Sequence, residues 1–171
     1  MSVLQLIKRR RSIRKYKPNQ VERDKLERIL EAGRLAPSAA NRQPWHFIAV
    51  TDPEHVATLR ASYAKPWEVT APAILAVCIE PSKSWVRKKD GEEFWKVDAA
   101  IALQNMVLCA AEEGLGTCWI ASFDEEDARK VLGVPNDVRV VAMTPLGYPD
   151  EVKGEVTERK DLKEIVHYEK W

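Results

Sequence analysis

The sequence Pro37-Ser38-Ala39-Ala40-Asn41-Arg42-Gln43-Pro44-Trp45 forms a polar, amide-containing stretch that begins with a proline. Upstream of it lies the basic run Arg9-Arg10-Arg11-Ser12-Ile13-Arg14. The amide side chains in the first stretch each offer a hydrogen-bond donor and an acceptor. The guanidinium groups in the second can bind phosphate oxygens in bidentate fashion. Together, the two stretches could hold opposite ends of one flat, phosphorylated heterocycle.

Size and composition narrow the class of protein. A length of 171 residues predicts a single domain over residues 1–171 with a sizeable core. The 27 basic and 26 acidic residues nearly cancel, to a net charge of +1, so basic character is local. No apolar run approaches the ~20 residues that span a bilayer, and the N-terminus reverses signal-peptide order. We therefore expect a cytoplasmic protein that binds no membrane.

Cysteine and histidine usage argues against a metal or disulfide framework. Cys78, Cys109 and Cys118 are too few and too scattered for either, so we expect them to be reduced and mostly buried. The three histidines do not cluster with carboxylates in any ligand spacing. We expect no metal site.

Helical and strand patterns alternate along the chain. We expect helices after a Ser2/Gln5 capping box, at 21–35, at 53–63, at 97–113, and after Asp124 up to Gly133. We expect strands at 46–50, 73–79, 117–121 and 139–146. The 73–79 strand is apolar throughout and should be covered on both faces. There is no Gly-x-Gly-x-x-Gly turn, so a dinucleotide-binding Rossmann domain would lack its phosphate loop. The pattern favours an α+β sheet with flanking helices.

Residues 81–96 show neither helical nor strand periodicity. Trp85, Phe94 and Trp95 lie there among charged side chains. Exposed aromatic surface of this kind often marks a binding site, which favours a mobile lid. The alternative is that two of these side chains simply cover the edge of the helix that follows.

Two further segments belong with the 9–14 basic run and the 37–45 stretch: Gly114-Leu115-Gly116-Thr117-Cys118-Trp119-Ile120 and Leu146-Gly147-Tyr148-Pro149. Together the four segments resemble the nitroreductase family of flavin mononucleotide (FMN) enzymes, and the resemblance covers nearly the whole chain. The resemblance implies an α+β fold with a central, mostly antiparallel sheet flanked by helices. It also implies an intertwined homodimer with two flavins at the interface. The apolar tail, which contains Ile165, Val166, Tyr168 and Trp171, would then dock on the neighbouring subunit.

The resemblance also assigns roles to residues. The cofactor-binding set that it implies is Arg10, Arg11, Ser12, Arg14, Pro37, Ser38, Ala39, Asn41, Gln43, Ile120, Ala121, Ser122 and Arg159. The 10–14 motif would hold the phosphate and ribityl chain, with Arg14 near the pyrimidine side of the ring, and Arg159 would return to the phosphate. The 37–44 loop would come from the partner subunit, and a backbone amide of 120–122 would donate to flavin N5. Many members of the family have serine at the Ala39 position and glycine or Glu-Gly in the stretch that is Ala121-Ser122 here.

The activity implied is ping-pong reduction of a small aromatic acceptor, such as a nitroaromatic or a quinone, by NAD(P)H. Hydride would pass through flavin N5, so we expect no catalytic side chain. The same scaffold also resembles flavin-fragmenting benzimidazole synthases and reductive dehalogenases, which differ in their pocket lids. A nucleic-acid-binding module using the basic run at 8–17 is the non-enzyme alternative. We expect no nucleic-acid partner, because a net charge of +1 offers little long-range attraction to a phosphate backbone.

Overall fold

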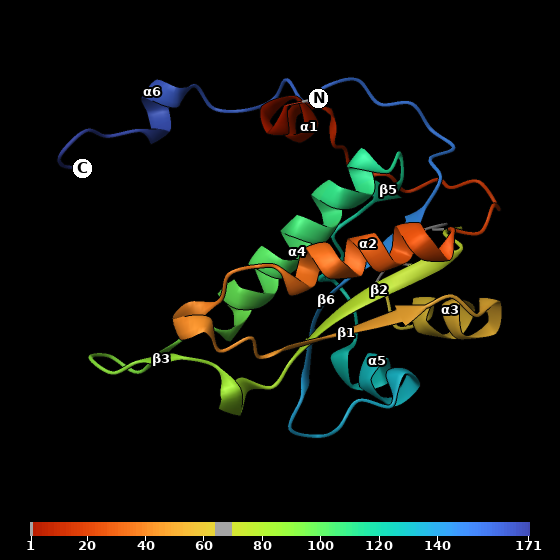
Figure 1. Cartoon of the computed structure of the whole chain (residues 1–171), viewed down its shortest axis with the longest axis horizontal. Coiled ribbons are helices and arrows are strands. Elements are labelled where there is room, and N and C mark those ends of the chain that lie inside the picture. Colours follow the sequence, from red (N-terminus) through yellow and green to blue (C-terminus); the bar gives the residue numbers. More distant parts are fainter. Residues whose placement is uncertain (1, 64–69) are drawn as a thin grey trace.

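A four-stranded antiparallel sheet forms the centre of the protein in the computed structural model, which describes residues 2–63 and 70–171 (Figure 1). The strands follow the order β1-β2-β6-β5 across the sheet. Their bounds are β1 Trp45–Val50, β2 Ala73–Ile79, β5 Gly116–Thr117 and β6 Arg139–Gly147. The expected α+β architecture with a mostly antiparallel sheet is confirmed.

Strand β2 is the centre of the core. All seven of its residues are buried, as its uninterrupted apolar sequence predicted. Because side chains alternate across a strand, Leu75 and Val77 pack into one apolar cluster, and Ile74 and Ala76 pack into a second cluster on the other face. The sheet is therefore covered on both faces.

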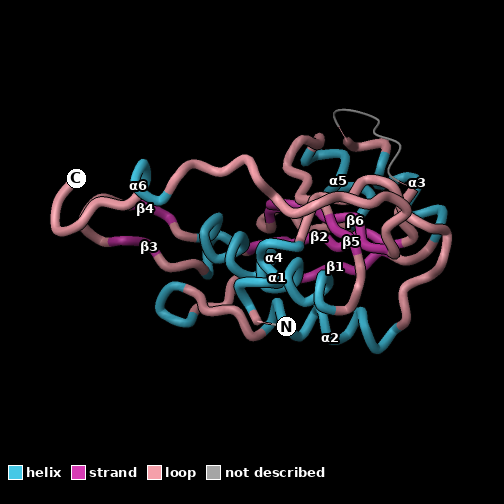
Figure 2. The backbone as a smooth tube through the Cα atoms, turned by 90° about the horizontal axis from the view of Figure 1, so that it is seen from above, coloured by secondary structure: helices cyan, strands magenta, loops and turns pink. Residues whose placement is uncertain are grey.

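Helices supply that cover in two outer layers. Their bounds are α1 Val3–Arg9, α2 Arg23–Arg34, α3 Pro53–Arg60, α4 Trp95–Glu112, α5 Glu125–Leu132 and α6 Leu162–Ile165, with short 3-10 turns η1 Ala39–Asn41 and η2 Pro81–Lys83. Figure 2 shows α1, α2 and α4 on one side of the sheet and α3 and α5 on the other. None of the described helices combines the length and apolar character needed to cross a membrane.

The helix caps follow the sequence signals. Ser2 and Gln5 form the expected capping box, Asp52 caps α3 by accepting the amide of His55, and α5 ends at Gly133 in the left-handed conformation. The long helix α4 packs along α2, and Gly33 makes the close approach possible. A Cβ at Gly33 would lie 2.8 Å from Met106.

Three sequence expectations need correction. The 117–121 segment is not a continuous strand: β5 ends at Thr117, because the Cys118 amide donates to the Thr144 hydroxyl instead of to a backbone carbonyl. Ile120 then pairs again with β6 through Met143. Helix α3 ends at Arg60, short of the expected end at 63. Residues 81–96 do contain strands, since β3 Val86–Arg87 and β4 Glu92–Glu93 form a hairpin.

The hairpin and the C-terminal tail both extend from the body of the molecule (Figures 1 and 2). The tail carries α6 and ends with Tyr168 at 85% and Trp171 at 102% exposure. Both side chains face solvent, and the Trp171 ring stacks on the His167 ring with the centroids 4.5 Å apart. Cys78 and Cys118 are buried and Cys109 is half-buried, all as free thiols, as expected.

Candidate functional site

The 10–14 motif leaves α1 and runs between two other segments. Arg10 caps α1 and turns the chain out of the helix. Ser12 then forms a parallel bridge with Thr117, and the Ile13 amide donates to the Thr117 carbonyl at 2.8 Å. Further on, the Lys17 amide donates to the Tyr148 carbonyl. The motif is thus joined to both glycine-containing segments that the sequence singled out, 114–120 and 146–149.

Tight packing holds this arrangement. A Cβ at Gly116 would lie 2.8 Å from the side chain of Ile13, so glycine is needed where the motif crosses β5. Burial raises the pKa of the Tyr16 phenol, which therefore stays protonated and donates to the Ile13 carbonyl at 2.5 Å. The position of Ser12 and Arg14 on either side of Ile13 is fixed by these contacts.

The predicted phosphate-binding residues converge in one cavity of about 400 Å³. The cavity is lined by Arg10, Arg11, Ser12, Arg14, Lys153, Glu155, Val156, Thr157, Glu158 and Arg159. Five of these side chains are basic and two are acidic, so the lining carries excess positive charge. Arg11 donates to the Gly154 and Glu155 carbonyls, which ties the tail to the motif. The structure therefore brings Arg159 to the arginines that lie far from it in the sequence.

Glu151 and Lys153 are site residues that the sequence reasoning missed. Glu151 Oε1 accepts the Arg14 amide at 2.6 Å, and Lys153 Nζ donates to the Ser12 carbonyl at 2.6 Å. Their side chains also form an ion pair at 3.1 Å. A Glu-x-Lys pair soon after the 146–149 segment was the available signal, but such pairs are common on solvated surfaces.

The 120–122 segment follows the short strand that bridges the motif. The bridge joins Ser12 to Thr117, so the segment begins three residues beyond the residue that pairs with the motif. The Ile120 amide donates to the Met143 carbonyl at 2.8 Å, so of the three amides in the stretch predicted to donate to flavin N5 this one is already hydrogen-bonded within the sheet. Ala121 and Ser122 are exposed and lie outside any strand, which leaves their amides as the candidates for that role.

The 37–44 loop lies elsewhere. Ala39 is bonded to Asp98 in the first turn of α4, whereas Arg10 and Arg11 share a second cavity of about 380 Å³ with Ala111 and Glu112 at its other end. Figure 1 shows η1 and α1 at opposite ends of α4. Of the predicted loop residues, Pro37, Asn41 and Gln43 are exposed, and Ser38 and Ala39 are half-buried. One chain does not bring these residues to its own basic cavity.

The aromatic residues proposed as a lid divide into two groups. Trp85 and Phe94 are half-buried and stack edge to face at the base of the hairpin, with ring centroids 5.1 Å apart. Trp95 is only 8% exposed, begins α4 and packs in the main apolar cluster. The expectation that Trp95 avoids core packing is therefore wrong, because the helix starts two residues earlier than predicted and turns this side chain inward.

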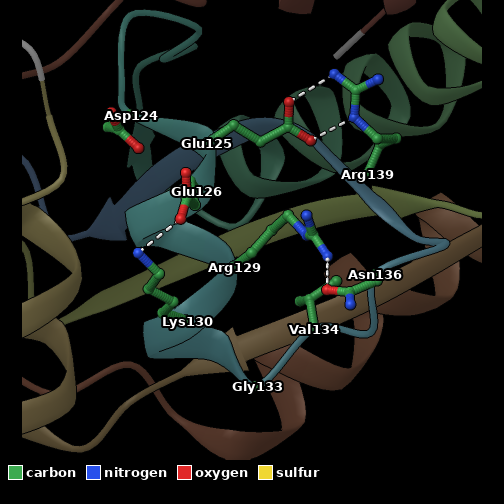
Figure 3. Close-up of a pocket in the computed structure, with 9 residues that line it drawn as sticks. All are labelled: Asp124, Glu125, Glu126, Arg129, Lys130, Gly133, Val134, Asn136 and Arg139. Carbon is green, nitrogen blue, oxygen red and sulfur yellow. Dashed lines mark hydrogen bonds and ion pairs between the residues drawn. The ribbon is translucent and has the colours of Figure 1, made fainter.

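A larger cavity, of about 690 Å³, lies between α5 and the start of β6 (Figure 3). Its charged side chains neutralise one another. Glu125 pairs with Arg139 at 2.6 Å and Glu126 with Lys130 at 2.8 Å, while Arg129 donates to the Asn136 side chain. The hydrogen bond from Arg139 holds the pKa of Glu125 below its usual range. Because its three acidic and three basic side chains cancel in net charge, this cavity is a weaker candidate for a charged ligand than the basic one.

The described residues offer no metal site as an alternative candidate, because no group of three or more His, Cys, Asp or Glu side chains among them is placed to hold an ion. The candidate site is therefore the basic cavity, and the 120–122 segment beyond β5 is its candidate extension. Its donors are guanidinium, ammonium, hydroxyl and backbone N–H groups, a set that recognises phosphate.

Comparison with known proteins agrees with this chemistry. The nitroreductase family profile matches residues 7–73 and 62–148. A protein of Archaeoglobus fulgidus, whose provisional name joins NADH dehydrogenase and NAD(P)H nitroreductase, is 35% identical over 98% of each chain. An iodotyrosine deiodinase of Thermotoga neapolitana is 26% identical, over 86% of this chain and 89% of its own.

Solved structures are also similar. A nitroreductase family protein from Clostridium difficile 630 superposes with a TM-score of 0.91 at 31% identity and full coverage of both chains. An FMN-dependent nitroreductase from Clostridium difficile R20291 gives a TM-score of 0.87 at 32% identity, over 98% of this chain and 99% of that one.

Proposed function

This chain belongs to the nitroreductase family, and from that premise we propose that it is an FMN-dependent oxidoreductase that takes electrons from NAD(P)H. The observation that carries the proposal is the basic cavity, where Arg10, Arg11, Arg14 and Arg159 converge with Lys153. A phosphate monoester carries close to two negative charges at neutral pH. The cavity offers more cations than carboxylates to receive it.

The residues present fit an FMN cofactor. Ser12 adds a hydroxyl donor to the cationic groups. The exposed Ala121-Ser122 backbone follows β5, which bridges the motif at Ser12. Bound FMN would accept hydride from NAD(P)H and pass electrons to a flat acceptor such as a nitroaromatic or a quinone. The chain's task is to hold the ring and to place positive charge beside it. Arg14, in the basic cavity and two residues beyond the Ser12–Thr117 bridge, is our candidate for stabilising negative charge on the reduced ring.

We propose that no side chain of this protein forms a covalent bond to the substrate. The work of the residues is then binding, orientation and charge stabilisation. The half-buried pair Trp85 and Phe94 on the hairpin is the candidate lid for an aromatic acceptor.

We further propose that the working form is a homodimer with two sites, each built from both chains. Asp98, which holds the 37–44 loop, and Glu112, beside the arginines, are separated by 14 residues of α4. At a rise of 1.5 Å per residue this distance is about 21 Å. An exposed loop with Asn41 and Gln43 at that distance is placed to serve a neighbouring chain. Exposed apolar side chains on α1 and the tail, such as Val3 at 69% and Trp171 at 102% exposure, offer surface for that contact.

The test begins with the absorption spectrum of the purified protein. A flavin spectrum, with FMN released on denaturation, is expected, followed by rapid bleaching when NADH or NADPH is added without oxygen. Reoxidation by a nitroaromatic and a quinone, with iodotyrosine as a parallel acceptor, separates reductase from deiodinase activity. A protein that binds riboflavin as tightly as FMN would contradict the phosphate site, and one that binds no flavin would contradict the whole proposal.

A further inference from the structure

Asp98 is a carboxylate buried in the first turn of α4, with 1% of its surface exposed. No other acidic or basic residue in the described part of the chain is buried to this degree. Its Oδ1 accepts a hydrogen bond from the Ala39 amide at 2.9 Å. Its Oδ2 is also buried and has no partner among the described residues. Burying a carboxylate with only one of its two oxygens hydrogen-bonded lowers the stability of the folded state. A contribution to stability therefore does not explain why an aspartate stands at this position.

The loop that Asp98 contacts has a strained backbone. Ala40, Asn41 and Gln43 have φ angles of 50°, 53° and 49°, in the left-handed region that non-glycine residues rarely adopt. Strain of this kind persists only where the surroundings enforce it, and it gathers at functional sites.

Internal hydrogen bonds hold the shape of the loop. The Gln43 amide donates to Ser38 Oγ at 2.9 Å, and the Gln43 side chain donates to that of Asn41 at 3.2 Å. Neither bond attaches the loop to the body of the protein. The bond from the Ala39 amide to Asp98 does, because α4 is packed into the core.

We propose that Asp98 is a positioning residue that fixes the 37–43 loop for contact with a flavin held by the other chain of a dimer. This inference rests on the proposed function. A carboxylate is a stronger acceptor than a neutral group, so it can hold a loop that would otherwise relax from its strained conformation. A loop that is already ordered costs less to bind against.

The first experiment compares flavin affinities. Asp98→Ala should weaken FMN and riboflavin binding by the same factor, about tenfold or more for a lost charge-assisted hydrogen bond, because the loop lies away from the phosphate. Asp98→Asn keeps an oxygen acceptor for the Ala39 amide and should restore most of the affinity. Gln104→Ala, an exposed position on the same helix, is the matched control.

A mixed dimer supplies a sharper test. One subunit carries Arg10→Ala and the other Asp98→Ala, with different affinity tags so that the heterodimer can be purified. If Asp98 acts on the partner's flavin, both defects fall in one site and the other site is intact. The expected result is one FMN per dimer bound with wild-type affinity. If Asp98 acts within its own chain, each site has one defect and neither binds tightly.

The outcomes are separable. A mixed dimer without a wild-type site, or a protein that is monomeric with flavin bound, overturns the Asp98 proposal while loss of FMN by Arg10→Ala still supports the phosphate site. An Arg10→Ala homodimer with unchanged FMN affinity overturns the proposed phosphate site, and the Asp98 inference falls with it. General instability of Asp98→Ala would weaken both sites of the mixed dimer together, so it cannot imitate the expected result.

Discussion

Replacing Glu151 by alanine should loosen the segment that carries the arginines. Its Oε1 accepts the Arg14 amide at 2.6 Å and the Lys15 amide at 3.3 Å, and it pairs with Lys153. The side chain is 21% exposed, so water replaces only part of what is lost. A hydrogen bond to a charged group contributes about 1.5–3 kcal/mol, and the partly exposed ion pair adds little. We therefore expect the free energy of unfolding to fall by about 2 kcal/mol.

Thermal denaturation followed by circular dichroism measures this loss. In a chain of this length 1 kcal/mol corresponds to a shift of about 2–4 °C, so Glu151→Ala should melt about 4–8 °C below wild type. Glu151→Gln keeps an oxygen acceptor and should lose less. Asp150→Ala is the matched control, since Asp150 is exposed and its backbone bond to Lys15 is retained. If Glu151→Ala has the same melting temperature as Asp150→Ala, the reasoning is refuted.

The effect should also depend on pH. Burial raises the pKa of the Glu151 carboxyl, but the hydrogen bonds from the Arg14 amide and from Lys153 outweigh it, so the net pKa is lowered. A group with a lowered pKa in the folded state stabilises the protein above its unfolded pKa and ceases to do so as the pH falls through the folded value. The difference between wild type and Glu151→Ala should be full at neutral pH and vanish in acid. A difference in stability that persists at a pH below both the folded and the unfolded pKa of Glu151 would contradict this role of its carboxylate.

Four further changes test other parts of the molecule. Arg159→Ala should weaken FMN binding by about 2 kcal/mol and leave riboflavin binding unchanged in calorimetric titration, because only the phosphate contact is lost. Trp95→Ala should lower the free energy of unfolding by about 3–5 kcal/mol, as for a buried tryptophan, whereas Trp85→Ala should leave the melting temperature in place and change KM for aromatic acceptors. Removal of the residues after Lys160 should convert the proposed dimer to a monomer in light scattering; a flavin-loaded dimer of unchanged stability would show that the tail is dispensable.

Much of the fold could be predicted from local signals in the sequence. Helix α3 begins at the Asp52-Pro53 signal. Helix α5 begins after Asp124 and ends at Gly133. These signals act through contacts within a few residues. The apolar run of β2 was equally informative because both of its faces are buried. Such features depend on short-range physics, so a single sequence contains them.

The incorrect predictions occur where long-range contacts determine the structure. The Thr144 hydroxyl, 26 residues away, accepts the hydrogen bond of the Cys118 amide, so β5 ends early. Nothing near Cys118 in the sequence signals this contact. The sequence pattern places Trp95 in an irregular segment, whereas in the structure α4 begins at Trp95 and its side chain is buried. Asp98 stands in the first turn of the expected 97–113 helix, where an acidic residue is a common surface feature. Its burial and its contact with Ala39 depend on long-range packing that the sequence does not signal.

The two halves of the proposed site differ in how they are built. The phosphate half is formed within one chain from segments near its two ends, Arg10 to Arg14 and Lys153 to Arg159, and intrachain bonds such as Lys153 to Ser12 fix it. The other half is a strained, exposed loop held at the far end of α4. Because α4 is packed in the core, closing that distance by a hinge would disrupt the main apolar cluster. Addition of a second chain completes the site without any such change, so on this proposal dimer formation and cofactor binding stabilise each other.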